Sequence, residues 1–219
     1  MRLEPSGKSE LVNQLCFGEL YKLIERQDSW TQILTLKDNY HGWINNNQVL
    51  ELNYSEEDFS SYKITSNPIQ KFLLGNEHIH LPAGSIIYSN IPELDAKILD
   101  ESQNALISRS SKPEWNKLEN YARQYINTPY LWGGKSLMGM DCSGFIQIIF
   151  RLIGIDLPRD AYQQANIGEN IAFLQQAELG DLAFFQNQDG KITHVGLLLG
   201  PDLIIHAHGK LRIDQIDNE

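Results

Sequence analysis

The strongest constraint on the fold is a run of almost uninterrupted apolar residues in the second half of the chain. It begins at Phe145, ends at Ile153 and is followed by Gly154. A helix that is apolar nearly all round must be buried, and glycine commonly follows the last helical residue. The run therefore predicts a central buried helix with Cys142 in its first turn.

The segments around this run predict a mixed fold. An amphipathic helix is expected after the Ser-Ser-Lys-Pro stretch at 110–113, because Trp115, Leu118, Ala122 and Tyr125 follow at spacings of three and four. Extended segments are expected later, at 181–185, 193–199 and 203–207. Helices followed by strands indicate an α+β domain, which we place at 111–219.

The first half of the chain has a different pattern, with short strand-like pieces separated by polar breaks. They lie at 20–24, 31–34 and 40–44, and similar pieces follow at 69–74 and 80–88. Such a pattern is typical of small barrels or sandwiches. We predict a small all-β domain at 1–55 and a second β unit or a linker at 56–110.

Charge and hydropathy narrow the class of protein. The chain has 219 residues and a formal net charge of −10, which disfavours nucleic acids and anionic membrane surfaces as partners. The start, MRLEPSGKSE, lacks the apolar segment of a signal peptide. We expect a soluble, cytoplasmic monomer, or a periplasmic or extracellular protein if a leader has been removed.

Only two cysteines are present, Cys16 and Cys142, which excludes a disulfide framework and a four-cysteine zinc site. Cys16 lies between Leu15 and Phe17 and is expected to be a small buried hydrophobe. Cys142 differs, because the N-terminus of a helix favours a thiolate. Asp141 would oppose this effect by its charge, although its carboxylate can also cap the helix.

A histidine partner for Cys142 is expected from the last two strands. If the hairpin is centred on Gly200, His194 faces His206, because both are six residues from the turn. One imidazole can then act as the base while the other holds it in place.

Simpler interpretations stay open: a buried helix cysteine, two strand histidines with ordinary hydrogen bonds, or a zinc site of Cys142, His194 and His206. His78 and His80 form a His-X-His pair that could bind a metal or simply face solvent, and His208 is expected to face solvent or to be a minor member of the site.

At this point the sequence resembles the NlpC-type papain-like cysteine peptidases of bacteria. The matching motifs, in order, are Tyr-Leu-Trp-Gly-Gly at 130–134, Asp-Cys-Ser-Gly-Phe at 141–145, Leu-Pro-Arg-Asp-Ala at 157–161, Leu-Gly-Asp-Leu-Ala-Phe-Phe at 179–185, His-Val-Gly at 194–196 and Ile-His at 205–206. The resemblance implies a Cys142, His194 and His206 triad without cofactor or metal. It also implies that Tyr130 assists the oxyanion, that Trp132 packs beside the substrate, and that Asp141 and Ser143 contact its D-Glu portion.

The first 110 residues resemble the bacterial SH3-like domains that precede this catalytic domain in murein-peptide γ-D-glutamyl-L-diamino acid peptidases. The match rests on residues 9–12, 17–19 and 38–43. It implies an enzyme of murein recycling that requires a free N-terminal L-Ala and releases L-Ala-γ-D-Glu. The substrate amine would be held by Glu10, Tyr40 and Asp160, although Glu10 is equally expected as a solvated surface acid and Tyr40 as part of a barrel core.

One departure from the family concerns the chain end. After the second histidine strand the family continues with a further strand or two, whereas only residues 211–219 remain here, which predicts a missing edge strand. Two other functions stay open: an endopeptidase of intact peptidoglycan and a non-catalytic module that binds wall peptides.

Overall fold

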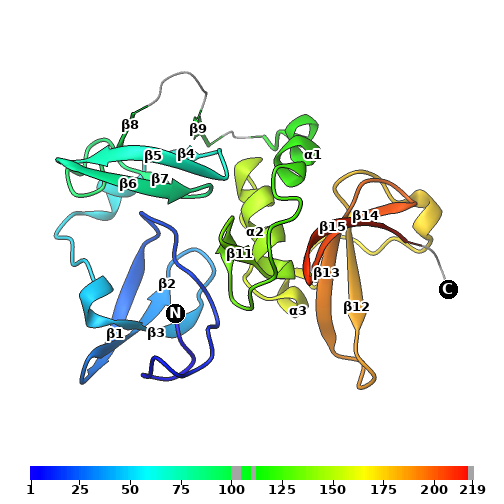
Figure 1. Ribbon diagram of the computed structural model, residues 1–219, viewed down its shortest axis with the longest axis horizontal. Coiled ribbons are helices and arrows are strands. Elements are labelled where there is room, and N and C mark those ends of the chain that lie inside the picture. The colour runs from blue at the N-terminus through cyan, green and yellow to red at the C-terminus, as the bar shows by residue number, and fades with distance from the viewer. Residues whose placement is uncertain (100–104, 110–111, 217–219) are drawn as a thin grey trace. The chain divides into compact units, whose positions relative to one another are not determined.

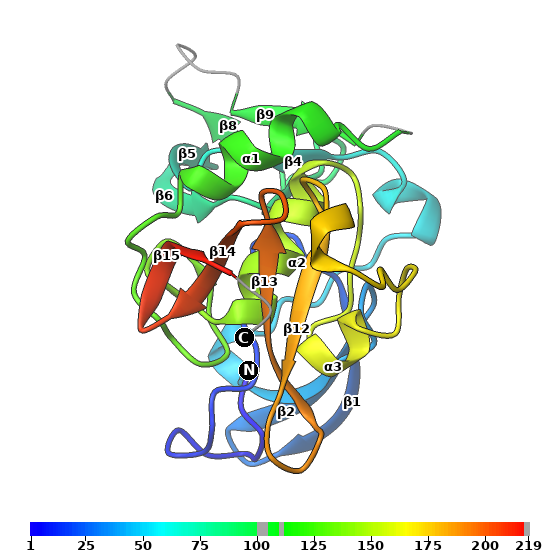
Figure 2. The same ribbon diagram turned by 90° about the vertical axis from the view of Figure 1, so that its right-hand side faces the viewer.

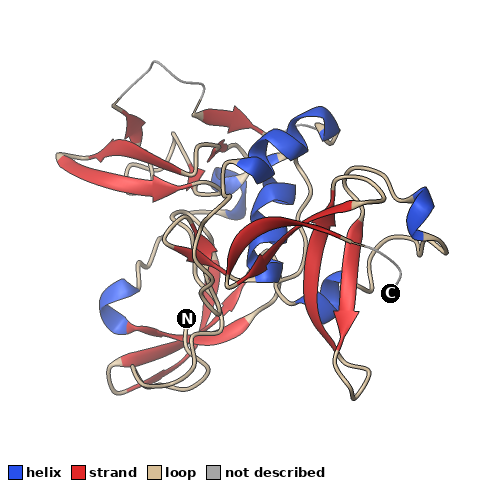
Figure 3. Ribbon diagram, turned by 45° about the vertical axis from the view of Figure 1, so that its right-hand side comes forward, coloured by secondary structure: helices blue, strands red, loops and turns tan. Residues whose placement is uncertain are grey.

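The computed structural model describes residues 1–99, 105–109 and 112–216, which form two compact units, Met1–Arg109 and Ser110–Glu219 (Figure 1). The first is built of strands with short helical turns, and the second combines helices with a four-stranded sheet (Figure 3).

Three antiparallel strands open the first unit, in the order β1-β2-β3. Their bounds are β1 Tyr21–Gln27, β2 Trp30–Thr35 and β3 His41–Asn45. Along β2, Thr31, Ile33 and Thr35 are buried and the residues between them are partly exposed, as a strand with one face on a core requires. The strands expected at 20–24, 31–34 and 40–44 are confirmed, with β1 three residues longer at its end.

The rest of the first unit contains two further small sheets, β7-β4-β9 and β6-β5-β8. Their strands are β4 Lys63–Thr65, β5 Ile69–Leu74, β6 Glu77–Pro82, β7 Ile86–Ile87, β8 Lys97–Ile98 and β9 Leu106–Ser108. The 3-10 turns lie at Asn46–Gln48 and Glu56–Phe59.

Phe17 joins the early and late parts of this unit. Its side chain packs against the cluster that contains Phe72 and against the cluster that contains Ile86. Its carbonyl also accepts a hydrogen bond of 2.8 Å from the Ile86 N–H. The segments before and after residue 55 therefore share a core, and the boundary at 55 stays a prediction.

The second unit begins with helix α1, Trp115–Arg123, which buries Leu118 and Ala122. Residues 110 and 111 of its expected start lie outside the described residues. Two-stranded β10 Lys135–Ser136 and β11 Gly139–Met140 follow, then α2 Cys142–Leu152, α3 Ala161–Gln164 and the 3-10 turn Leu174–Gln176.

Helix α2 is the centre of the second unit, as the apolar run predicts. All 11 of its residues are buried, including Gln147 and Arg151. Gln147 Nε2 donates to the Leu157 carbonyl at 3.0 Å. The helix ends before Gly154, whose φ of 96° is the left-handed conformation that glycine adopts most easily.

The antiparallel sheet of the second unit has the order β12-β13-β14-β15 (Figure 2). Its strands are β12 Leu182–Gln186, β13 Ile192–Leu198, β14 Leu203–His208 and β15 Lys210–Gln215. The expectation of a missing edge strand is wrong, because β15 pairs with β14 along its whole length, from His208↔Lys210 to Leu203↔Gln215.

The other edge of β15, which faces away from β14, is also hydrogen-bonded. The Leu211 N–H donates to the Thr128 carbonyl at 2.8 Å, and the Leu211 carbonyl accepts from the Asn127 N–H at 2.8 Å. Lys210 Nζ donates to Asn127 Oδ1 at 2.6 Å. The segment before β10 thus covers part of the edge that an outermost strand otherwise exposes.

Candidate active site

The N-terminus of α2 places Cys142 as the first helical residue. Asp141 is the N-cap, and its Oδ1 accepts from the Gly144 N–H at 2.7 Å, which confirms the capping role expected for this carboxylate. Gly144 leaves room for the glycine-rich loop, because a Cβ on it would lie 2.3 Å from the Gly134 carbonyl oxygen. The Gly-Gly and Ser-Gly pairs of the motifs thus fit against each other.

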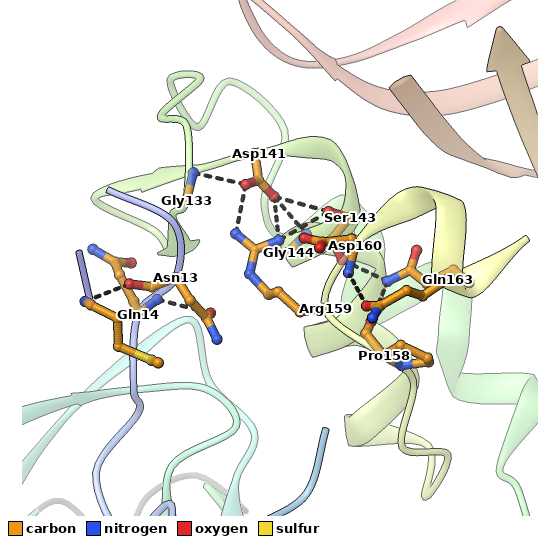
Figure 4. A network of polar contacts seen from close by, with 12 residues as sticks. Asn13, Gln14, Gly133, Asp141, Ser143, Gly144, Pro158, Arg159, Asp160 and Gln163 are labelled. Carbon is orange, nitrogen blue, oxygen red and sulfur yellow. Dashed lines mark hydrogen bonds and ion pairs between the residues drawn. The ribbon is translucent and has the colours of Figure 1, made fainter. Parts of the chain in front are cut away.

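A buried ion pair supports this helix start. Arg159 binds both oxygens of Asp141, with Nη1 to Oδ1 at 3.0 Å and Nη2 to Oδ2 at 2.6 Å (Figure 4). Arg159 also donates to Ser143 Oγ at 2.9 Å, and the Gly133 N–H donates to Asp141 Oδ2 at 2.8 Å. Both Asp141 oxygens are therefore bound within the chain. Their expected contact with substrate stays a prediction, and Arg159 is a supporting residue that sequence reasoning missed.

Burial determines the state of the Cys142 thiol. Its pKa lies above the usual value, first because the side chain is buried and second because of the Asp141 charge. The backbone N–H groups of Val195 and Ser143, and the Arg159 charge, act in the opposite direction. The helix N-terminus was expected to lower the pKa of Cys142, but burial and the Asp141 charge outweigh that effect. The thiol therefore carries its proton at neutral pH.

The register of the histidine hairpin differs from the expected one. Gly196, not His194, pairs with His206, because the loop centre is Pro201: the Leu199 N–H bonds to the Leu203 carbonyl at 2.9 Å. A shift of two residues keeps every side chain on the same face of the sheet. The two histidines are therefore diagonal neighbours.

Glycine at position 196 makes this diagonal contact possible. A Cβ there would lie 2.4 Å from Ile204 Cδ1 and 2.9 Å from the Cβ of His206. With that space open, His194 Nε2 and His206 Nδ1 lie 2.9 Å apart. The structure thus brings the two predicted histidines into hydrogen-bond contact.

A carboxylate continues the chain of contacts beyond His206. His206 Nε2 lies 2.8 Å from Oδ2 of Asp214 in β15, and Arg212 Nε lies 2.7 Å from the same oxygen. His206 pairs directly with Arg212 across the strands, so Asp214, two residues on, points to the same face. Asp214 was missed because its strand was expected to be absent; the alternation Lys-Leu-Arg-Ile-Asp at 210–214 was the signal for it.

His194 is neutral in this arrangement. Burial lowers its pKa to about 4, with further lowering by the charges of His206 and His208. The Val195 N–H reaches the Cys142 thiol, and Val195 directly follows His194 in the chain. The sulfur therefore lies close to the backbone end of the His194 side chain. A neutral thiol and a neutral imidazole are the groups that a nucleophile and its general base require; these roles of Cys142 and His194 stay a prediction.

Two aromatic side chains, Tyr130 and Phe185, lie near this pair. Burial, and next the Cys142 charge, raise the pKa of Tyr130 to about 12, which indicates a phenol that lies near the sulfur and keeps its proton. The Tyr130 N–H is anchored by the Gly209 carbonyl at 2.9 Å. The Phe185 ring lies 5.7 Å from that of His194, and Trp132 is 57% exposed.

The predicted amine-binding residues have separate surroundings. Asp160 is the N-cap of α3 and forms a capping box with Gln163, whose Oε1 accepts from the Asp160 N–H at 3.2 Å. In the first unit, Glu10 is exposed and Tyr40 is partly buried. The Tyr40 N–H donates to Thr35 Oγ1 at 2.8 Å. Their joint action on a substrate stays a prediction.

Three other cysteine and histidine expectations can be compared with the structure. Cys16 is buried, as expected. His208 is exposed, and its ring stacks on His206 at 6.0 Å. Within residues 1–99, 105–109 and 112–216, no group of three or more His, Cys, Asp or Glu side chains is placed to hold a metal ion, so the zinc alternative has no ligand set there. No helix in the same ranges is long and apolar enough to cross a membrane.

Known proteins match both units. Residues 127–219 match the NlpC/P60 family, and residues 1–49 match the bacterial dipeptidyl-peptidase Sh3 domain. The gamma-D-glutamyl-L-lysine dipeptidyl-peptidase of Bacillus subtilis is 28% identical over 217 residues, which span 90% of this chain and 72% of the relative. Dipeptidyl-peptidase 6 of Lysinibacillus sphaericus is also 28% identical, over 99% of this chain and 88% of that protein.

A solved structure agrees in fold. The crystal structure of an NlpC/P60 family protein from Bacillus cereus superposes with a TM-score of 0.81 at 21% identity and covers 93% of this chain and 76% of that one. The expected α+β fold, a papain-like domain of NlpC type preceded by small all-β SH3-like structure, is confirmed.

Proposed function

We propose that this chain, a cysteine peptidase whose residues 127–219 match the NlpC/P60 family, cleaves the bond between γ-D-Glu and the L-diamino acid of murein peptides with a free N-terminal L-Ala. The product would be L-Ala-γ-D-Glu. The observation that carries the proposal is the placement of Cys142 at the start of α2, where the N–H of Val195, the residue after His194, reaches its thiol, while His194 contacts His206. The N-terminal part of the chain also matches a dipeptidyl-peptidase Sh3 domain.

The proposed mechanism starts from the neutral pair. His194 accepts the thiol proton as the Cys142 sulfur attacks the γ-carbonyl carbon of D-Glu. The resulting oxyanion is stabilised by the Cys142 N–H at the helix start and by the Tyr130 hydroxyl. His194 then gives its proton to the leaving amine of the diamino acid, and a thioester remains on Cys142.

The second half of the cycle uses the same base. His194 takes a proton from water, the resulting hydroxide attacks the thioester carbonyl, and the thiol leaves with its proton restored. Asp141 and Ser143 are proposed to face the D-Glu portion and Trp132 to pack beside it. His206 holds the base in position.

The test of the chemistry is hydrolysis of L-Ala-γ-D-Glu-diaminopimelate, followed by release of the dipeptide, with the lysine analogue in parallel. Cys142→Ala is expected to lower kcat by at least about 10³-fold, because no other nucleophile replaces the thiol. Cys16→Ala is the matched control, since Cys16 is the other free cysteine and lies in the other unit. Turnover by Cys142→Ala at the wild-type rate would disprove the mechanism.

The free amine is tested separately with an N-acetylated substrate. Acetylation removes the positive charge that Asp160, Glu10 and Tyr40 are proposed to hold, and kcat/KM is expected to fall by about 100-fold, as for loss of one desolvated charge contact. Asp160→Asn is the most informative variant, because asparagine caps a helix about as well as aspartate but carries no charge. Equal cleavage of free and blocked peptides would remove these residues from the binding role.

We extend the proposal to the cell compartment: an enzyme that needs free peptide ends would act on released peptides during murein recycling in the cytoplasm. Cell fractionation with an antibody against the chain tests this extension, and recovery outside the cytoplasmic fraction would contradict it.

A further inference from the structure

Asp214 has a contact that the proposed Cys142, His194 and His206 mechanism does not use. Its Oδ2 lies 2.8 Å from His206 Nε2 and 2.6 Å from Arg212 Nη2. The His206 hydrogen bond, and next Arg212, hold the pKa of this carboxyl below its usual range, so it is ionised at neutral pH. An ionised carboxylate can only accept hydrogen bonds, and therefore Nε2 of His206 must carry a hydrogen.

This hydrogen determines what the other ring nitrogen of His206 can do. In a neutral imidazole one nitrogen donates and the other accepts. With the hydrogen on Nε2, Nδ1 of His206 is an acceptor, and the nitrogen 2.9 Å away, Nε2 of His194, must be the donor. His194 then has its lone pair on Nδ1.

Nδ1 is the nitrogen that the chemistry requires. It is the ring nitrogen nearer the backbone, and the Val195 N–H that follows His194 reaches the Cys142 sulfur. If His206 carried its hydrogen on Nδ1 instead, that hydrogen would point at Nε2 of His194. The His194 hydrogen would then lie on Nδ1, which could not accept the thiol proton.

Arg212 has a complementary effect on the same carboxylate. Arg212 contacts the oxygen that His206 uses, through both Nε and Nη2. It therefore holds the carboxylate at the position where it accepts from Nε2 of His206.

We propose that Asp214 is a positioning residue which fixes the tautomer of His206 and, through it, that of His194, so that Nδ1 of His194 is left to accept the proton of Cys142. This inference deepens the proposed function and rests on it for the identity of the reaction. The tautomers themselves can be observed without any substrate, so the two proposals can fail separately.

The direct test is nitrogen-15 NMR of the full chain with labelled histidine at neutral pH, since the shifts of the two ring nitrogens report which one carries hydrogen. The proposal expects hydrogen on Nε2 of both His194 and His206 in the wild type. In Asp214→Ala, His206 is expected to become a mixture of both tautomers. A wild-type His206 with its hydrogen on Nδ1, or unchanged tautomers in Asp214→Ala, would overturn it.

Kinetics on the murein peptide give a second readout. Asp214→Ala is expected to lower kcat about 10- to 100-fold, part of what a general base contributes, with KM within about twofold because Asp214 does not touch substrate. Asp214→Asn keeps an acceptor oxygen of nearly the same size, and its kcat is expected to fall only about three- to tenfold. A wild-type kcat for Asp214→Ala would contradict the proposal.

Two comparisons separate this role from folding. Asp189→Ala removes a carboxylate from the exposed loop between β12 and β13 and is expected to keep the wild-type kcat. Thermal unfolding of Asp214→Asn, which retains volume and an acceptor, shows whether β15 stays in place. A folded Asp214→Asn variant with the same kcat loss as Asp214→Ala would show that charge, not the acceptor and its tautomer, is what matters, and would overturn the proposal.

Discussion

Among the aspartate–arginine pairs of the second unit, the pair beside Cys142 and the pair beyond the two histidines differ mainly in burial. The side chains of Asp141 and Arg159 are 8% and 1% exposed, whereas those of Asp214 and Arg212 are 32% and 45% exposed. Removing charges from water costs several kcal/mol each, and a buried pair offsets this cost only by close contacts.

The contacts of the two pairs reflect that difference. Asp141 has two guanidinium contacts and two backbone N–H donors, Gly133 and Gly144. Asp214 uses a single oxygen for both His206 and Arg212. The buried pair therefore supports the structure around the nucleophile, and the half-exposed pair adjusts a proton position at little cost in stability.

The largest expected effect concerns the thiol next to the buried pair. Because burial and Asp141 raise the pKa of Cys142, the thiolate fraction and the alkylation rate should rise about tenfold per pH unit, or about 100-fold from pH 6 to pH 8. Iodoacetamide labelling of a Cys16→Ala variant, followed by mass spectrometry, measures this. A rate that is flat over the range would mean that a thiolate–imidazolium pair already exists.

The second effect is the loss of the buried guanidinium. Arg159→Met would leave the charge of Asp141 buried without its partner and is expected to cost about 3–5 kcal/mol in the free energy of unfolding. Denaturant titration measures it. The control combines Asp141→Asn with Arg159→Met. It removes the buried charge of Asp141 but keeps a capping side chain at the start of α2, so much of the stability should return. A double variant as unstable as Arg159→Met would contradict this interpretation.

The third effect is a loss of stability in mild acid. The unfolded chain protonates His194 near pH 6.5, but the folded chain resists until its pKa of about 4, so stability should fall as the pH drops through this window, by up to about 3 kcal/mol. Asp214, with its lowered pKa, loses its contribution only at still lower pH. Wild type should lose this stability relative to His194→Gln between pH 7 and pH 4, and a difference in unfolding free energy that stays constant with pH would contradict the prediction.

The smallest effect is expected at the half-exposed pair. Arg212→Met should change the free energy of unfolding by less than about 1 kcal/mol, as exposed ion pairs usually do. The comparison with Arg159→Met uses the same substitution and the same measurement. A loss as large as that of Arg159→Met would show that burial does not distinguish the two pairs.

Sequence reasoning located what depends on local pattern. The α2 helix, its start at Cys142 and the capping role of Asp141 follow from an apolar run and a capping residue, and the structure has all three. The register of the histidine hairpin was wrong by two residues, because the loop centre depends on the hydrogen bond between Leu199 and Leu203, which turn composition does not specify.

The supporting residues were not predictable in the same way. Arg159 looks like an ordinary charged loop residue in the sequence, and only the packing around it shows that it is buried against Asp141. Asp214 lies in the last strand of the described residues, and its significance depends on which strand face His206 occupies. Both are properties of tertiary contacts, not of local periodicity.

The raised pKa of the buried Cys142 thiol has a consequence for oxidative damage. Peroxides oxidise thiolates much faster than thiols, and the later oxidation states of cysteine are irreversible. In the proposed mechanism, a nucleophile that keeps its proton between turnovers is a poor target for peroxide, and it becomes reactive only as His194 takes the proton during attack on a bound peptide. Protection from oxidation and activation for catalysis would then be controlled by the same proton.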